Sequence, residues 1–167
     1  MAVAEHRARS PVSVPCFVLT LSDTRTLETE TSGRAIADLL AAAGHTVVDR
    51  RLAKDEPAEV RRIVVDELGR GRARAIITTG GTGIAKRDST YEALTALFEK
   101  RLDGFGELFR VLSFEDIGAA AMLSRATAGV ANGCVVFLLP GSEAAVRMAM
   151  ERLILPELGH IVGELSR

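Results

Sequence analysis

The chain has 167 residues, enough for one domain with a sizeable core, and its 47% hydrophobic and 26% charged residues are an ordinary globular balance. Its net charge of −1 disfavours broad nucleic-acid binding, which needs a basic surface. No apolar run approaches the length of a membrane span, so we expect neither nucleic acid nor membrane as a partner.

The first residues and the cysteines bear on the cell compartment. Residues 1–14 lack the apolar core of a signal peptide, and we expect them to form a mobile tail ahead of a single domain over residues 15–167. Cys16 and Cys134 each open an apolar run, which favours buried core thiols over reactive or disulfide-bonded ones. We therefore predict a cytoplasmic protein.

From residue 16 onward, short apolar runs alternate with helical periodicity. Residues 16–21 predict a strand covered on both faces, and residues 45–52 predict a second, partly exposed strand. The apolar residues between them fall at helical spacing up to Ala43, and Gly44 stands where a helix stop is expected.

The next helix is expected to begin near Pro57, with Asp55 or Glu56 at its cap. Residues 74–79 then predict a third strand. Ser89 and Glu92 have the spacing of a capping box, so a further helix should begin there.

The last third of the chain contains one hairpin signal and one helix signal. Residues 104–122 are helical or irregular, and their pattern does not separate the two. Asn132-Gly133 between two strand-like runs predicts a hairpin. A helix should follow Ser142, and Pro156 should interrupt it.

This order of elements predicts an α/β fold, namely a three-layer α/β/α sandwich whose mostly parallel, doubly wound sheet includes an antiparallel hairpin member. Ligands of such sheets bind beyond the carboxyl ends of the strands. Three loops meet that condition and should converge on one crevice: "SDTRT" at residues 22–26, "TGGTG" at 79–83 and "PGS" at 140–142.

The glycine-rich loop matches neither standard nucleotide motif. It has no P-loop sequence, and Lys86 stands where the dinucleotide fingerprint requires its third glycine. Glycines nevertheless let backbone N–H groups approach an anion, and the hydroxyls of Thr79 and Thr82 are further donors. Either the loop binds a phosphate or its glycines only form a tight turn. Ser142 likewise suits a ligand loop or a simple helix cap.

Asp88 is the acid closest to this loop in sequence. A carboxylate beside a phosphate is repelled by it unless a divalent cation lies between them, and Mg²⁺ is bound in this manner. The alternative is an acid stabilised by a helix dipole. Asp55 and Asp23 are possible second carboxylates, and Lys86 and Arg87 either neutralise phosphate charge or are solvated.

The motifs together resemble one known family. "LSD", "TSG", "KDE", "TTGGTGIAKRDSTYEA", "LSRATAG" and "LPGS" occur in the order found in the molybdopterin-binding family of MoaB, MogA and the gephyrin G domain. The resemblance covers the chain from about Phe17 to its end. The segment from Gly104 to Gly133 is most similar to the MoaB branch.

This resemblance implies a function and a set of site residues. Active relatives adenylylate molybdopterin with Mg²⁺-ATP and release pyrophosphate. They form trimers or hexamers, and other enzymes of molybdenum cofactor biosynthesis are expected binding partners. Asp88 and Asp55 would be catalytic and would hold the metal. Further residues would bind phosphate or line the substrate pocket: Thr79, Gly80, Gly81, Thr82, Gly83, Ser22, Asp23, Ser32, Gly33, Pro140, Gly141 and Ser142.

Two functional alternatives stay open beside adenylylation. Arg87-Asp88 and Thr90 match the active relatives, which favours an enzyme, whereas a non-catalytic molybdopterin carrier or scaffold needs none of them. An unrelated nucleotide enzyme of this fold, of the CinA type, is the third possibility. The apolar segment with Phe105, Leu108, Phe109 and Leu112 is either a subunit contact or part of the core.

Overall fold

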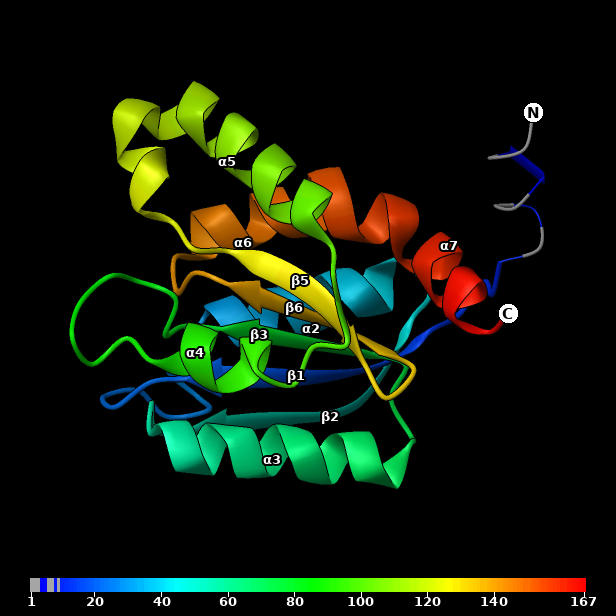
Figure 1. The fold of residues 1–167 in the computed structure, drawn as a ribbon, viewed down its shortest axis with the longest axis horizontal. Helices are drawn as coiled ribbons and strands as arrows, with labels where there is room; N and C mark the ends of the chain where they lie inside the picture. Colours follow the sequence, from blue (N-terminus) through cyan, green and yellow to red (C-terminus); the bar gives the residue numbers. More distant parts are fainter. Residues whose placement is uncertain (1–3, 6–7, 9) are drawn as a thin grey trace.

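The computed structural model describes residues 4–5, 8 and 10–167, and its centre is one six-stranded sheet (Figure 1). The strand order is β2-β1-β3-β6-β5-β4. β2, β1, β3 and β6 are parallel, whereas β5 is antiparallel to both of its neighbours. The strands are β1 (Pro15–Leu21), β2 (Thr46–Ala53), β3 (Ala75–Thr79), β4 (Lys100–Arg101), β5 (Thr127–Ala131) and β6 (Cys134–Leu139).

Helices cover both faces of this sheet, which confirms the predicted sandwich (Figure 1). Val18 and Phe137 point to one face with Ile36, whereas Phe17 and Leu138 point to the other. The first face carries α2 (Ser32–Ala42), α5 (Asp103–Ile117), α6 (Glu143–Ala149) and α7 (Leu155–Leu165); the second carries α3 (Pro57–Arg70) and α4 (Thr90–Thr95).

Local signals in the sequence placed several element ends correctly. Pro57 occupies the first turn of α3, and Glu56 rather than Asp55 is its N-cap residue. The hairpin between β5 and β6 turns at Asn132 and Gly133, whose φ angles of 48° and 71° are those of a tight hairpin turn.

Of two further predictions from local sequence, the capping box was wrong and the interruption of the last helix was right. α4 begins at Thr90, but the Glu92 carboxylate pairs with Arg125 and not with the backbone of Ser89, so the capping box does not form. The interruption expected at Pro156 is present: the π-helical turn η2 (Met150–Ile154) separates α6 from α7, and Pro156 occupies the first turn of α7.

The segment whose structure the sequence left open is α5 followed by the 3₁₀ turn η1 (Gly118–Leu123). Phe105 and Phe109 pack into the core, and the ring centroid of Phe105 lies 5.2 Å from that of Phe137. Leu108 is 55% exposed, and Val111 and Phe114 further along the helix are 57% and 60% exposed. Core packing therefore accounts for one side of α5 and leaves the other side uncovered.

The remaining predictions concern the termini and the thiols. Cys16 and Cys134 are buried free cysteines, as predicted, and burial raises the pKa of each thiol to about 12. None of the helices in the described residues is long and apolar enough to cross a membrane. The predicted mobile tail falls partly on residues 1–3, 6–7 and 9, outside the described set, although Val14 at its end is fully buried.

Candidate functional site

The three predicted loops meet at the carboxyl ends of β1, β3 and β6. The hydroxyl of Ser32, at the start of α2, donates to the carbonyl of Gly141 at 2.7 Å. The hydroxyl of Thr79 donates to the carbonyl of Pro140, also at 2.7 Å, and the amide of Gly80 donates to Leu139 at 3.0 Å. Adjacent parallel strands bring their ends together at one edge of the sheet, so these contacts follow from the topology.

The glycines after β3 are required by the backbone. Gly80 and Gly81 have φ angles of 104° and 71°, in the region that L side chains rarely adopt. A Cβ on Gly80 would lie 2.5 Å from the carbonyl oxygen of Leu21, and one on Gly81 would collide with the hydroxyl of Thr90. The loop is therefore a tight turn, and it also brings bare backbone to the edge of a cavity.

Two cavities lie beside this turn and meet at Gly141 and Ser142. The larger has a volume of about 500 Å³, is mostly apolar, and is lined by Gly80 to Gly83, Asp88 and residues of α5 and α6. The smaller, of about 330 Å³, is lined by polar groups that include Ser22, Ser32 and Thr79. Both volumes lie in the range of small-molecule sites.

Asp88 and Asp55 approach the glycine turn from different elements. One carboxylate oxygen of Asp88 accepts from the Ala85 amide at 3.1 Å, and one of Asp55 accepts from the Thr90 hydroxyl at 2.9 Å. Burial raises the pKa of Asp55, the Thr90 hydrogen bond opposes this, and the charges of Asp88 and Asp23 raise it further. The two acids are therefore close enough to repel each other.

Asp23 connects the loop after β1 to the other two. It accepts from the Asp55 amide at 3.3 Å and forms an ion pair with Arg87. Neither Asp23 nor Asp55 lines the two cavities, whereas Asp88 lines the larger one. Lys86 is exposed.

The remaining predicted site residues fall into two groups. Ser142 caps α6 through a 3.5 Å contact with the Ala145 amide and lines both cavities. Thr82 lines the larger cavity. Gly33 lines neither, because its amide donates to the Glu30 carboxylate at 2.7 Å and a Cβ there would strike the Thr20 hydroxyl. Gly33 thus serves close packing.

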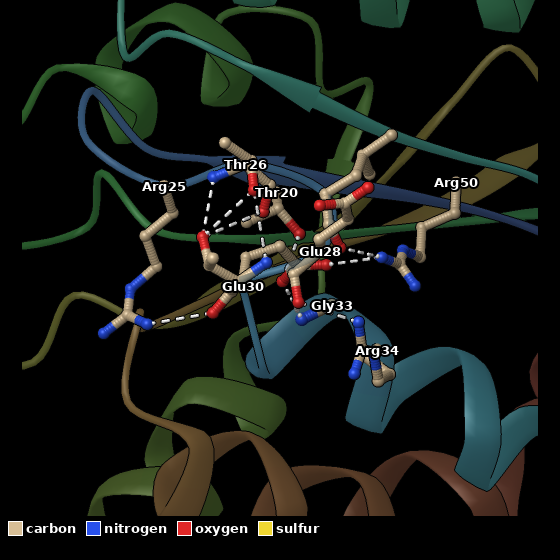
Figure 2. Close-up of polar contacts among 10 residues, drawn as sticks. Thr20, Arg25, Thr26, Glu28, Glu30, Gly33, Arg34 and Arg50 are labelled. Carbon is tan, nitrogen blue, oxygen red and sulfur yellow. Dashed lines mark hydrogen bonds and ion pairs between the residues drawn. The ribbon is translucent and has the colours of Figure 1, made fainter.

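Glu30 is the main residue that the sequence reasoning missed, and Figure 2 shows it between Thr20, Gly33 and Arg50. Its side chain is only 1% exposed, and one oxygen accepts from Thr20 at 3.1 Å and from Gly33 at 2.7 Å. The other oxygen lies 3.2 Å from the Arg50 guanidinium. An acid three residues before a helix-opening glycine was the available signal for this role.

Three further residues near the cavity were not predicted either. Ser113 and Asp116, one turn apart on α5, line the larger cavity. Arg125 lies behind the glycine-rich loop and contacts its backbone. These positions depend on the fold of residues 103–126, which the sequence pattern did not resolve.

Comparison with known proteins gives consistent results. Residues 17–160 match the family described as "Probable molybdopterin binding domain". The chain is 50% identical over 168 residues to molybdenum cofactor biosynthesis protein B of Halalkalibacterium halodurans, covering 100% of this chain and 99% of that protein.

Solved structures show the same similarity. A crystal structure of molybdenum cofactor biosynthesis protein B has a TM-score of 0.91 at 49% identity and covers 95% of this chain and 99% of that one. The tungsten cofactor synthesizing protein MoaB from Pyrococcus furiosus has a TM-score of 0.84 at 37% identity, with coverage of 95% and 100%.

Proposed function

Because the chain belongs to the molybdopterin-binding family and is a relative of molybdenum cofactor biosynthesis protein B, we propose that it adenylylates molybdopterin. Membership of this family gives it a part in molybdenum cofactor biosynthesis. The proposed step joins molybdopterin to the AMP part of ATP and releases pyrophosphate.

The observation that carries this proposal is the glycine turn at the junction of two cavities. Gly80 to Gly83 bring bare backbone to the larger cavity, and the amides of Gly81, Thr82, Gly83 and Ile84 donate to no acceptor within the described residues. Free N–H groups at a strand end suit phosphate. Two cavities that share Gly141 and Ser142 give room for two substrates side by side.

The acids beside the turn fit Mg²⁺. Asp55 and Asp88 each have one oxygen engaged by the protein and one without a partner in the described part of the chain. No set of three or more His, Cys, Asp or Glu side chains is placed to bind a metal among residues 4–5, 8 and 10–167. Mg²⁺ is commonly coordinated by one or two carboxylates together with oxygens of the substrate phosphates. Bound here, the ion would offset the negative charge of those phosphates.

In the proposed reaction, an oxygen of the terminal phosphate of molybdopterin attacks the α-phosphorus of ATP. The bond from that phosphorus to the bridging oxygen breaks, and pyrophosphate leaves. The protein's contribution is positioning and charge stabilisation, without a nucleophile of its own. The loop amides would donate to phosphate oxygens as charge gathers on them.

A second candidate is a molybdopterin carrier without turnover. This function is favoured because the charged groups nearest the turn already have partners within the protein. Arg87 forms an ion pair with Asp23, and Asp88 accepts a hydrogen bond from the Ala85 amide. In that arrangement the Arg87 charge is already neutralised within the protein.

An assay of pyrophosphate release separates these functions. The protein is incubated with molybdopterin, ATP and Mg²⁺, and each component is omitted in turn. Adenylylation predicts release that requires all three. Calorimetric binding of molybdopterin without release favours the carrier, and binding of ATP with indifference to molybdopterin favours an unrelated nucleotide enzyme.

We also propose a homo-oligomer, a trimer or a hexamer, held by the uncovered side of α5 and η1. Val111, Phe114 and Met122 are 57%, 60% and 75% exposed there, and exposed apolar groups of this size commonly mark interfaces. Phe114→Glu should lower the molar mass measured by light scattering, whereas Glu115→Gln on the same helix should not. An unchanged mass in Phe114→Glu would place the interface elsewhere.

A further inference from the structure

Arg125 contacts the end of the glycine-rich loop and the backbone of Asp88 beyond it. The residue lies just before β5, and its side chain is 27% exposed. Its guanidinium donates to the backbone carbonyl of Gly83 at 2.6 Å and 3.1 Å, to the backbone carbonyl of Asp88 at 3.1 Å and, more weakly, to that of Thr82 at 3.4 Å. One side chain, distant in sequence, thus ties the backbone of Gly83 to that of Asp88.

The orientation of this guanidinium is itself fixed. Its carbon lies 4.8 Å from the centre of the Tyr91 ring, within the range of cation–π contact, and one nitrogen pairs with Glu92. Arg101 also donates to the Tyr91 hydroxyl at 2.7 Å. The planar fork of an arginine can serve several carbonyls at once, which the ammonium of a lysine cannot do in the same geometry.

These contacts determine where the loop amides point. In a planar trans peptide the C=O and N–H bonds point in opposite directions. Because the carbonyls of Thr82 and Gly83 point toward Arg125, the N–H groups of Gly83 and Ile84 point away from it. Gly83 and Asp88 line the larger cavity, whereas Arg125 does not. Arg125 instead lines a separate cavity with Ile84 and Asp88, so Gly83 and its amide, rather than the arginine, border the larger cavity.

We infer that Arg125 is a positioning residue, which holds the peptide planes of the glycine-rich loop so that their N–H groups face an anionic ligand in the larger cavity. The identity of that ligand as a substrate phosphate rests on the proposed function. Arg125 does not touch the ligand, and its positive charge acts on the loop carbonyls.

The test compares ATP binding with turnover. Dissociation constants for Mg²⁺-ATP, and for inorganic pyrophosphate as a smaller probe, are measured by calorimetry for the native chain, Arg125→Ala and Arg125→Lys. Arg62→Ala is the control, because Arg62 is an exposed arginine on α3 that forms ion pairs away from the site. Melting temperatures and KM for ATP are recorded in parallel.

We expect both Arg125 variants to bind Mg²⁺-ATP and pyrophosphate about tenfold or more weakly, because hydrogen bonds from the guanidinium to the loop carbonyls are lost. Both variants should also raise KM for ATP more than they lower kcat. Millimolar guanidinium should restore binding to Arg125→Ala but not alter Arg62→Ala. Native affinity in Arg125→Ala overturns the inference. So does weakened binding that tracks a lowered melting temperature and resists guanidinium, which indicates a purely structural role.

The two proposals can fail separately. If the native chain binds ATP without releasing pyrophosphate, adenylylation fails and the role of Arg125 is still decided by the binding constants. If the native chain binds neither ATP nor pyrophosphate, the inference about Arg125 is overturned.

Discussion

The loop after β1 and the loop after β3 both carry acids at the carboxyl edge of the sheet, but the two acids have different surroundings. Glu30 is 1% exposed; one of its oxygens accepts hydrogen bonds from Thr20 and Gly33, and the other forms an ion pair with Arg50 at 3.2 Å without a hydrogen bond in the described residues. Asp88 is half-buried at a cavity wall and has one oxygen without a partner in the described residues.

The difference separates a structural carboxylate from a reactive one. A buried charge is tolerated where hydrogen bonds and an opposite charge compensate it, and there it stabilises one conformation of the chain. An oxygen left free beside a cavity can meet a cation or a substrate. We therefore expect changes at Glu30 to act on stability and changes at Asp88 to act on turnover.

The largest effect should come from Asp88→Asn. Removing the charge while keeping the shape should lower the rate of pyrophosphate release by about 100-fold or more, as for other groups that stabilise a transition state through charge. The melting temperature should change little, because Asn can still accept from the Ala85 amide. Asp66→Asn on the exposed side of α3 is the control. Equal turnover in Asp88→Asn would remove that residue from the mechanism.

Glu30→Gln should give the opposite result. The amide cannot match the charge of Arg50 and can accept with only one oxygen, so the free energy of unfolding should fall by about 2–3 kcal/mol. Denaturant titration at fixed protein concentration measures it, since an oligomer's stability depends on concentration. Glu28→Gln, an exposed acid in the same loop, is the control (Figure 2). Native stability in Glu30→Gln would show that the contacts of this carboxylate contribute little.

The smallest effect concerns Asp55. Burial, with repulsion from Asp88 and Asp23, raises its pKa in the folded protein above that of the unfolded chain. The folded state therefore binds the Asp55 proton more tightly than the unfolded chain does, and protonated Asp55 stabilises the folded state. This contribution to the free energy of unfolding is complete below about pH 4 and is lost as pH rises through the folded pKa. The melting temperature of Asp55→Asn relative to the native chain should therefore increase with pH. A difference that does not vary with pH would contradict the raised pKa.

Sequence reasoning predicted that the three loops meet because their meeting point follows from topology. Strands marked by short apolar runs had to be parallel, and the loops after Leu21, Thr79 and Leu139 then had to meet at one edge. Glycines at positions 80 and 81 signalled positive φ and close approach of the backbone, and both features are present.

What the sequence did not predict depends on long-range contacts. Glu92 and Ser89 had capping-box spacing, but Arg125 competes for the carboxylate from 33 residues away. Gly33 was assigned to the pocket, yet its amide donates to Glu30, which forms an ion pair with Arg50 of β2. Local patterns contain no information about such partners until the chain is folded.

Analysis of the pterin product by mass spectrometry tests adenylylation most directly. The protein is incubated with molybdopterin, Mg²⁺ and ATP labelled in its adenine ring, and the pterin species are then separated and weighed. The account predicts a pterin whose mass has increased by one AMP unit and which contains the label. Recovery of unmodified molybdopterin from protein that binds it would contradict adenylylation and leave the carrier as the function.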